Sequence, residues 1–355
     1  MIIRNYFARC CAHAFCVGAV LAPAPAFADH MGPSGIGSGG GMNILSPDTL
    51  DEGHSAVGFR LTYTQPDQRS DAELEALAAE HVHAHNTDYN LNASLGAAFG
   101  VTHELTISAE LPFVRRDHLR EGAHSHDGGE TVNEVEQLGN VSGIGDLNLL
   151  AKYRLTHGET ANFALIGGLK VPTGSTHRRS EDGERLETEH QPGTGSWDPI
   201  FGAAFGTKIG SLGLSASALY QLSTRGAQRT ELGDRLQGGV ALSHRFGGQE
   251  EHHQHVASLN HHHGDELDEH DEAGGHSSWD GFLELVGEWE GRQKIGGDVE
   301  QESGGSVVWL APGARYNSAG GLSFAASFGV PVWQDIRSSH PDNDYRLSLS
   351  IGKAF

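Results

Sequence analysis

Cysteine is nearly absent from this chain of 355 residues. The sequence contains three cysteines, Cys10, Cys11 and Cys16. All three lie within residues 1–28, which have the features of a secretory signal peptide: Arg4 and Arg9 precede a short apolar run, and a small-x-small cleavage site ends at Ala28. We therefore expect an exported mature chain with no thiol, no disulfide and no cysteine-bound metal.

Long apolar runs and basic side chains are also scarce. After residue 28 no stretch approaches the roughly 18 consecutive apolar residues of a membrane-spanning helix, so we expect no such helix. The 24 lysines and arginines are outnumbered by 46 acidic residues, which gives a formal net charge of −22. Because an acidic surface repels phosphate groups, nucleic acid is excluded as a partner. The same surface, which carries many of the 23 histidines, attracts cations.

The sequence is rich in glycine, with 49 residues, and in apolar residues that alternate with small or polar ones. In "SAVGFRLTY", for example, Val57, Phe59 and Leu61 share one face of an extended chain. This alternation predicts twelve strands, most of them long enough to cross a bilayer when tilted. The predicted strands span residues 54–65, 87–100, 104–115, 144–156, 161–173, 196–207, 211–224, 233–246, 279–291, 305–317, 321–334 and 344–355.

The two faces of these strands differ in composition. One face is apolar and has aromatic residues near the strand ends, namely Tyr63, Tyr153, Tyr220, Trp289 and Tyr316. The other face mixes small and charged residues, and its charges include Lys152, Arg154, Glu284, Glu288 and Arg315. A soluble sandwich turns its apolar face inward, whereas a membrane barrel turns it toward lipid and lines its lumen with polar residues. Together with the signal peptide and the even strand number, the pattern favours an all-β fold, a 12-stranded antiparallel transmembrane barrel of a Gram-negative outer membrane.

The connections between the predicted strands alternate between short and long. Short turns are typical of the periplasmic side of such barrels, and long loops are typical of the external side. We expect residues 29–52 to form a flexible, glycine-rich periplasmic segment and residues 53–355 to form the barrel. The last strand ends at Phe355 and resembles the signal read by the outer-membrane barrel assembly machinery. The expected partners are therefore that machinery and the lipid bilayer.

Several glycine-rich motifs together resemble a known family. They are "SGIGDLNLLAKYRL" (142–155), "GGLKVPTGS" (167–175), "GSWDPIFGAAFG" (195–206), "LELVGEWEGR" (283–292), "WLAPGARY" (309–316) and "FGVPVWQDI" (328–336). In this order they resemble the outer-membrane family named for the meta-pathway of phenol degradation, over roughly residues 50–355. The resemblance implies a twelve-stranded barrel that acts as a transporter, and it supplies no catalytic residue.

Histidine clusters in the connections. An insertion at 247–278 contains eight histidines and no lysine or arginine. Neutral imidazole binds Zn, Ni, Cu and Co ions, so the candidate metal ligands are His252, His253, His255, His261, His262, His263, His270, His276, His81, His83, His85, His124 and His126. In "HVHAH" an extended chain would put three imidazoles on one face; a continuation of the short helix predicted at 71–82 would instead pair His81 with His85. The alternative is a solvated loop in which histidine is a polar filler. The strand count places the insertion on the periplasmic side, where turns are normally short.

The predicted lumen charges, Lys152, Arg154, Glu284, Glu288 and Arg315, have two interpretations. They could select solutes in a permeable path, or they could pair with one another and fill the barrel. No catalytic motif is present, so no enzyme activity is expected and no cofactor is required, apart from labile Zn, Ni, Cu or Co ions.

Three functions remain open on this sequence. The first is a channel or transporter for small solutes with accessory metal binding by histidine-rich loops. The second is a passive uptake channel for aromatic or apolar compounds, in which the histidines are incidental. The third is a metal-binding surface protein with a closed lumen.

Overall fold

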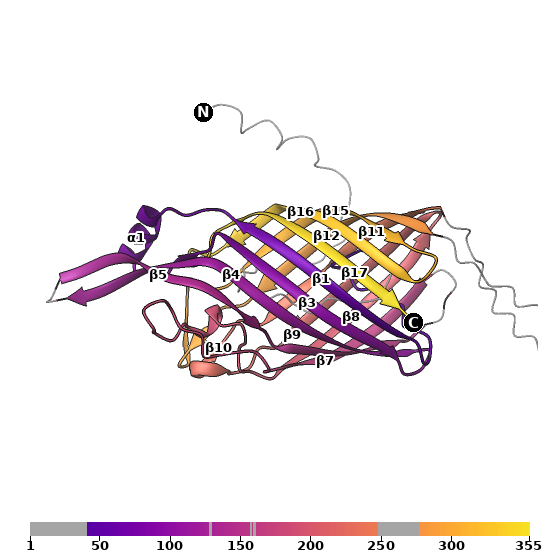
Figure 1. The fold of residues 1–355 in the computed structure, drawn as a ribbon, viewed down its shortest axis with the longest axis horizontal. Coiled ribbons are helices and arrows are strands. Elements are labelled where there is room, and N and C mark those ends of the chain that lie inside the picture. Colours follow the sequence, from indigo (N-terminus) through magenta and orange to yellow (C-terminus); the bar gives the residue numbers. More distant parts are fainter. Residues whose placement is uncertain (1–40, 128–129, 157, 159–160, 248–276) are drawn as a thin grey trace, which may run out of the picture.

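Twelve antiparallel strands close into a barrel in the computed structural model of this chain (Figure 1). The structure describes residues 41–127, 130–156, 158, 161–247 and 277–355. The barrel strands are β1 (Ser55–Pro66), β3 (Tyr89–Gly100), β4 (Leu105–Asp127), β6 (Leu147–Arg154), β7 (Ala161–Val171), β8 (Asp198–Ile209), β9 (Leu212–Gln221), β11 (Arg235–Phe246), β12 (Ser278–Glu290), β15 (Gly305–Asn317), β16 (Leu322–Ile336) and β17 (Asn343–Ala354). Each strand pairs with the next in this order, and the pairing of β1 with β17 closes the circle.

All twelve predicted strands are confirmed, because each predicted range overlaps one barrel strand. β4 continues past the predicted end at residue 115 and pairs with β5 (Glu130–Ile144) in a ribbon that projects beyond the barrel (Figure 1). The predicted long connection over residues 116–143 is thus largely a two-stranded ribbon. The short strand β2 (His85–Asn86) pairs with β4 at the base of this ribbon.

The predicted short helix is present as α1 (Asp71–Ala79). A capping box begins it: the Ser70 hydroxyl accepts a hydrogen bond from the amide of Glu73, and the Glu73 carboxylate accepts one from the amide of Ser70. The helix buries Leu74 against the ribbon, where a Cβ on Gly122 would lie 2.4 Å from the Leu74 carbonyl oxygen. Glycine at position 122 therefore permits the close approach. Within the described part of the chain, no helix is long and apolar enough to cross a membrane.

The two ends of the barrel carry different connections. At one end, here called the terminal end, the amide of Ser55 donates to the carbonyl of Phe355 (3.2 Å), so the barrel begins and finishes there. β11 ends and β12 begins at this end, so the histidine-rich insertion is attached there, although residues 248–276 themselves lie outside the described residues. The opposite end, here called the loop end, carries the connections 67–88, 172–197, 222–234, 291–304 and 337–342.

The loop-end connections contain small elements of their own. These are the 3-10 turns η1 (Thr188–His190) and η2 (Ala227–Arg229), and a small sheet of β10 (Thr230–Glu231), β13 (Lys294–Ile295) and β14 (Asp298–Val299). This sheet joins the connection 222–234 to the connection 291–304. The loop end is therefore a folded assembly held by backbone pairing.

The burial pattern is that of a membrane barrel. Apolar side chains face outward and are exposed, as in Leu95 (62%) and Phe201 (58%). Polar side chains of the alternate positions face the lumen and are buried, as in Thr62 (1%) and Glu284 (0%). This arrangement is the inverse of a soluble sandwich, as the sequence predicts.

The aromatic residues named from the sequence lie near the ends of the outer face. At the loop end Tyr63 stacks on Tyr345 with ring centroids 6.1 Å apart. At the terminal end Trp279 contacts Tyr316, with centroids 5.1 Å apart, and Tyr153 is 48% exposed. Aromatic girdles of this kind flank the lipid-facing band of membrane barrels, where amphipathic rings meet the headgroups.

Candidate functional site

The lumen of the barrel is occupied by residues 41–50, here called the lumen segment. Its two central apolar side chains, Ile44 and Leu45, are 2% and 6% exposed. Ile44 packs in a cluster with residues of β11, β12 and β15, and Leu45 packs in a second cluster with residues of β7, β8 and β9. Burial of each side chain contributes about 1.5–3 kcal/mol. The lumen segment is therefore anchored to two walls of the barrel.

Glu284 binds the backbone of the lumen segment. Its Oε1 accepts hydrogen bonds from the amides of Asn43 (2.8 Å) and Ile44 (3.2 Å), and its Oε2 accepts one from Asn43 Nδ2 (2.8 Å). A Cβ on Gly41 would lie 1.8 Å from Glu284 Oε1, so a side chain there would collide with the carboxylate. Glycine at position 41 thus allows the chain to pass Glu284.

Lumen cations bind carbonyl oxygens of the same segment. Arg60 donates a hydrogen bond to the carbonyl of Met42. Lys152 donates to the carbonyl of Ser46 (3.0 Å), and Arg315 donates to the carbonyl of Gly41 (2.8 Å). Three of the predicted lumen charges, Lys152, Glu284 and Arg315, therefore meet at the lumen segment. The opposite polarity of amide and carbonyl groups lets both signs of charge hold one piece of backbone.

This arrangement corrects the prediction for residues 29–52. Residues 29–40 lie outside the described residues, but residues 41–47 are packed inside the barrel instead of forming a flexible periplasmic segment, and residues 49 and 50 bind groups at the terminal end. The segment has no strand or helix periodicity, so sequence pattern gave no sign of its position. Apart from pattern, the one available signal was the apolar group "MNIL" (Met42–Leu45) within an otherwise small and polar stretch.

The other two predicted lumen charges bind the barrel itself. Arg346 donates two hydrogen bonds to Glu288 (2.6 and 3.0 Å), and Trp309 Nε1 donates a third to the same carboxylate (2.9 Å). The guanidinium of Arg154 donates to the His103 carbonyl (3.0 Å) at the terminal end. Glu288 and Arg154 thus bind groups of the barrel itself, and their partners are not among the five predicted lumen charges.

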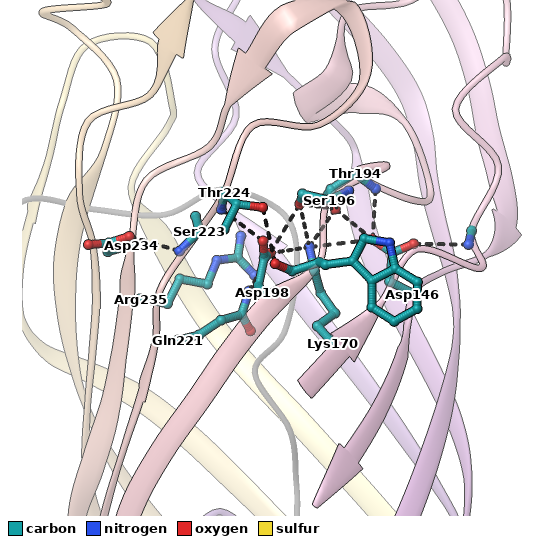
Figure 2. Close-up of polar contacts among 12 residues, drawn as sticks. Asp146, Lys170, Thr194, Ser196, Asp198, Gln221, Ser223, Thr224, Asp234 and Arg235 are labelled. Carbon is teal, nitrogen blue, oxygen red and sulfur yellow. Dashed lines mark hydrogen bonds and ion pairs between the residues drawn. The ribbon is translucent and has the colours of Figure 1, made fainter. Parts of the chain in front are cut away.

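A polar network centred on Lys170 lies nearer the loop end (Figure 2). Lys170 Nζ is 2.6 Å from Asp198 Oδ2 and 3.4 Å from Asp146 Oδ2, and it also donates to the hydroxyls of Thr194 (2.5 Å) and Ser196 (3.3 Å). Asp146 and Asp198 are 6% and 1% exposed. The lysine therefore forms ion pairs with two buried carboxylates.

The network joins three of the glycine-rich motifs. Asp146 comes from the first motif, and its carboxylate accepts hydrogen bonds from the amides of Gly174 (2.9 Å) and Thr194 (2.8 Å). A Cβ on Gly174 would lie 2.6 Å from the Cα of Gly193, so both chains approach too closely for a side chain. Asp146 and Asp198 lie in these motifs but were not among the predicted site residues. Their meeting depends on strand register, which no single motif contains.

Two cavities lie inside the barrel, and Arg60 is common to both. One, of about 310 Å³, is on the terminal side and is lined by Gly41, Arg245, Asp280 and Arg315 among others. The other, of about 50 Å³, lies on the loop side, between the Lys170 network and the wall of β1 and β3. Arg60, which binds the lumen segment, lines both cavities. The segment therefore contacts the residue that the two cavities share.

The predicted histidine ligands divide into three groups. The eight histidines from His252 to His276 lie outside the described residues, and the side chain of His126 is not described. His81 and His83 contact His124, with ring centroids 5.0 and 5.4 Å apart. His85 turns away and is buried (3%) beside His190.

Both predicted geometries for "HVHAH" are therefore wrong. The chain is not extended there, because His81 has a left-handed backbone with φ of 63°. It is not helical either, because α1 ends at Ala79. The turn that follows the helix ends at His81, and His85 lies beyond it in β2.

Carboxylates accompany the buried histidines. His190 Nε2 is 3.7 Å from Glu121 and 4.0 Å from Glu189, and His83 Nδ1 is 3.6 Å from Glu121. Burial acts to lower the pKa of His190, but Glu121 and Glu189 outweigh it and raise this pKa to about 9. Burial acts to raise the pKa of Glu121, but His190 and His83 outweigh it and lower this pKa to about 2. The site thus favours positive charge.

Several solved structures have similar folds. An outer membrane channel from Pseudomonas putida F1 is 17% identical and matches with a TM-score of 0.52, over 87% of this chain and 97% of the channel. The toluene transporter TbuX from Ralstonia pickettii is 9% identical, with a TM-score of 0.41, over 86% of this chain and 90% of the transporter. The β domain of the Bordetella autotransporter BrkA is 12% identical, with a TM-score of 0.43, over 86% of this chain and all of that domain (100%). No curated protein sequence matches the chain.

A family model matches residues 51–277, which is more than half of the chain. The family is described as "Putative MetA-pathway of phenol degradation". The match begins just after the lumen segment and includes the first three glycine-rich motifs, those that meet at Lys170. This chain therefore belongs to the MetA-pathway of phenol degradation family.

Proposed function

We propose that this chain is an outer-membrane channel for small solutes and that the lumen segment is its gate. The observation that carries the proposal is the packing of residues 41–46 in the lumen, where the Met42 carbonyl binds Arg60, a residue that lines two cavities. Displacement of this segment would join the two cavities and open a path along the lumen. The barrel wall would stay intact, because its strands pair with one another and not with the segment.

The proposed location is the outer membrane, reached through the signal peptide. The apolar outer face and its aromatic ends support insertion in a bilayer. The terminal end would face the periplasm, and the loop end would face the exterior. The final strand would be the element that the barrel assembly machinery recognises.

The preferred solute is a small organic anion with an apolar body, such as an aromatic carboxylate. Arg60, Arg245, Arg315 and Lys353 line the terminal-side cavity, against one carboxylate, Asp280. When the segment leaves, Arg60 and Arg315 lose backbone carbonyl partners, and a solute carboxylate could replace them. The two clusters that now hold Ile44 and Leu45 would then form apolar walls for the body of the solute.

Accessory metal binding by the histidine-rich connections remains part of the proposal. His81, His83 and His124 lie together at the loop end, and imidazole is a good ligand for divalent transition metals. The histidine-rich insertion would bind such ions at the terminal end, beneath the barrel. Binding at the loop end would be labile, because His81 and His83 are exposed to solvent.

Conductance in planar bilayers tests the gate. Glu284→Gln removes the charge that holds Asn43 and Ile44, and loss of about 1.5–3 kcal/mol raises the ratio of open to closed channels about tenfold or more. Glu288→Gln is the matched control, because Glu288 lies on the same strand and binds Arg346 and Trp309. In a salt gradient, the sign of the reversal potential should show that the channel prefers anions to cations. Benzoate should block the chloride current more strongly than acetate does. Equal conductance in the two variants, or cation selectivity, would contradict the proposal.

A further inference from the structure

A compact group of histidine and glutamate side chains lies at the loop end, outside the lumen. His85 from β2 and the pair Glu189 and His190 from η1 each place one ligand atom within 4.8 Å of the others. His85 and His190 are 3% and 1% exposed, and their rings contact at 4.6 Å between centroids. These residues come from the connections 67–88 and 172–197, which are far apart in the sequence.

Backbone and side-chain contacts hold this group in place. The amide of His85 donates to the Ser339 carbonyl (2.9 Å). The His190 carbonyl accepts a hydrogen bond from Arg116 (3.0 Å), which fixes η1. Gln293 Nε2 donates to Glu189 Oε2 (3.0 Å), which orients the carboxylate so that Oε1 is the atom nearer His190. Partners of this kind fix the orientation of metal ligands in proteins.

The chemistry of the group matches a divalent transition metal. Two imidazoles and one carboxylate form a common ligand set for zinc, with a fourth position left for water or another ligand. Tetrahedral zinc ligands at about 2.0–2.1 Å from the metal lie roughly 3.3 Å from one another, so the group would close inward by about 1 Å around an ion. Glu121, 3.7 Å from His190 Nε2, is placed to supply the fourth ligand.

We propose that His85, Glu189 and His190 form a binding site for one divalent transition-metal ion of the zinc class. The inference rests on the accessory metal binding proposed above. The tightest metal binding is thereby assigned to a buried set of residues and not to the exposed histidines. Two members of this set, Glu189 and His190, were not among the predicted ligands. The ion would join the connection 67–88 to the connection 172–197 and so tighten the loop end over the barrel mouth.

Cobalt binding by the full chain in detergent tests the site. Wild type should bind one tight Co²⁺ ion with visible d–d absorption bands, and Zn²⁺ should displace it. His85→Gln and His190→Gln should each lose this ion and its bands, whereas His177→Gln, an exposed histidine in the same connection, should keep both. Heat-modifiable gel mobility reports whether each variant is folded. If a variant fails to fold, Glu189→Gln takes its place, and it should weaken Co²⁺ binding at least tenfold.

The possible outcomes separate this inference from the proposed function. Retention of the tight ion in the folded site variants, or no tight ion in wild type, would overturn the inference. If deletion of residues 249–275 alone abolishes all binding, accessory metal binding stands and this site does not exist. If the deletion leaves one tight ion that His190→Gln removes, the inference is supported.

Discussion

The terminal half and the loop half of the lumen use the same kinds of charged side chain in different ways. In the terminal half, Glu284, Lys152 and Arg315 bind the backbone of the lumen segment. In the loop half, charged groups bind one another, as Lys170 does with Asp146 and Asp198. Charges that hold a separable segment can release it without disturbing the wall. Charges that pair across strands and connections are part of the wall. We therefore expect substitutions in the two halves to affect different measurements.

The largest effect is expected at Lys170. Lys170→Met leaves Asp146 and Asp198 buried without their cation, and loss of one partner of a buried ion pair costs about 3–5 kcal/mol. The free energy of unfolding, measured by urea titration in detergent, should fall by that amount. Single-channel conductance of the folded fraction should stay near that of wild type.

Two controls sharpen this prediction. Lys208→Met removes an exposed lysine from β8 and should change the free energy of unfolding by less than about 0.5 kcal/mol. Adding Asp198→Asn to Lys170→Met should recover part of the loss, because one uncompensated charge is removed. If Lys170→Met is as stable as Lys208→Met, the loop half is not held by this ion pair.

The second effect is expected at Ile44. Ile44→Ala removes an apolar anchor of the lumen segment, and truncations of this kind cost about 2–5 kcal/mol at buried sites. Because the segment is not a barrel strand, this cost should appear as a raised open probability, by tenfold or more, with little change in the urea midpoint. Ile209→Ala, on the outer face, should leave the open probability unchanged. A lower midpoint without greater conductance would mean that the segment is a structural core and not a gate.

Different parts of this structure were accessible from sequence to different degrees. The twelve strands were predictable because alternation is a local pattern. Val57, Phe59 and Leu61, for example, define one apolar face of a strand within five residues. The direction of the polar face followed from the same pattern, and so Lys152 and Glu284 were identified. What these charges bind was not predictable, because the lumen segment has no periodicity of its own.

The Lys170 network and the group of His85 and His190, both at the loop end, could not be predicted from the sequence. Asp146, Lys170 and Asp198 lie in quoted motifs, yet their meeting depends on the pairing of β6 with β7 and of β7 with β8. His85 and His190 meet because two connections fold over one mouth, which no local pattern encodes. Composition alone identifies a histidine-rich stretch as a candidate metal site. It does not identify two histidines that are far apart in the sequence and meet only in the folded chain.

The smallest effect on the barrel is expected from the histidine-rich insertion. Its described flanks, Gly247 and Ser277, lie at the terminal end, where other strands are joined by short turns. Deletion of residues 249–275 should therefore change the urea midpoint and the conductance little. Equilibrium dialysis with Ni²⁺ should show fewer weakly bound ions, because seven imidazoles are removed. A large loss of stability would instead mean that the insertion packs on the barrel. In that case the terminal end, like the loop end, would be closed by bonded connections, and the contrast between the two halves would be confined to the lumen segment.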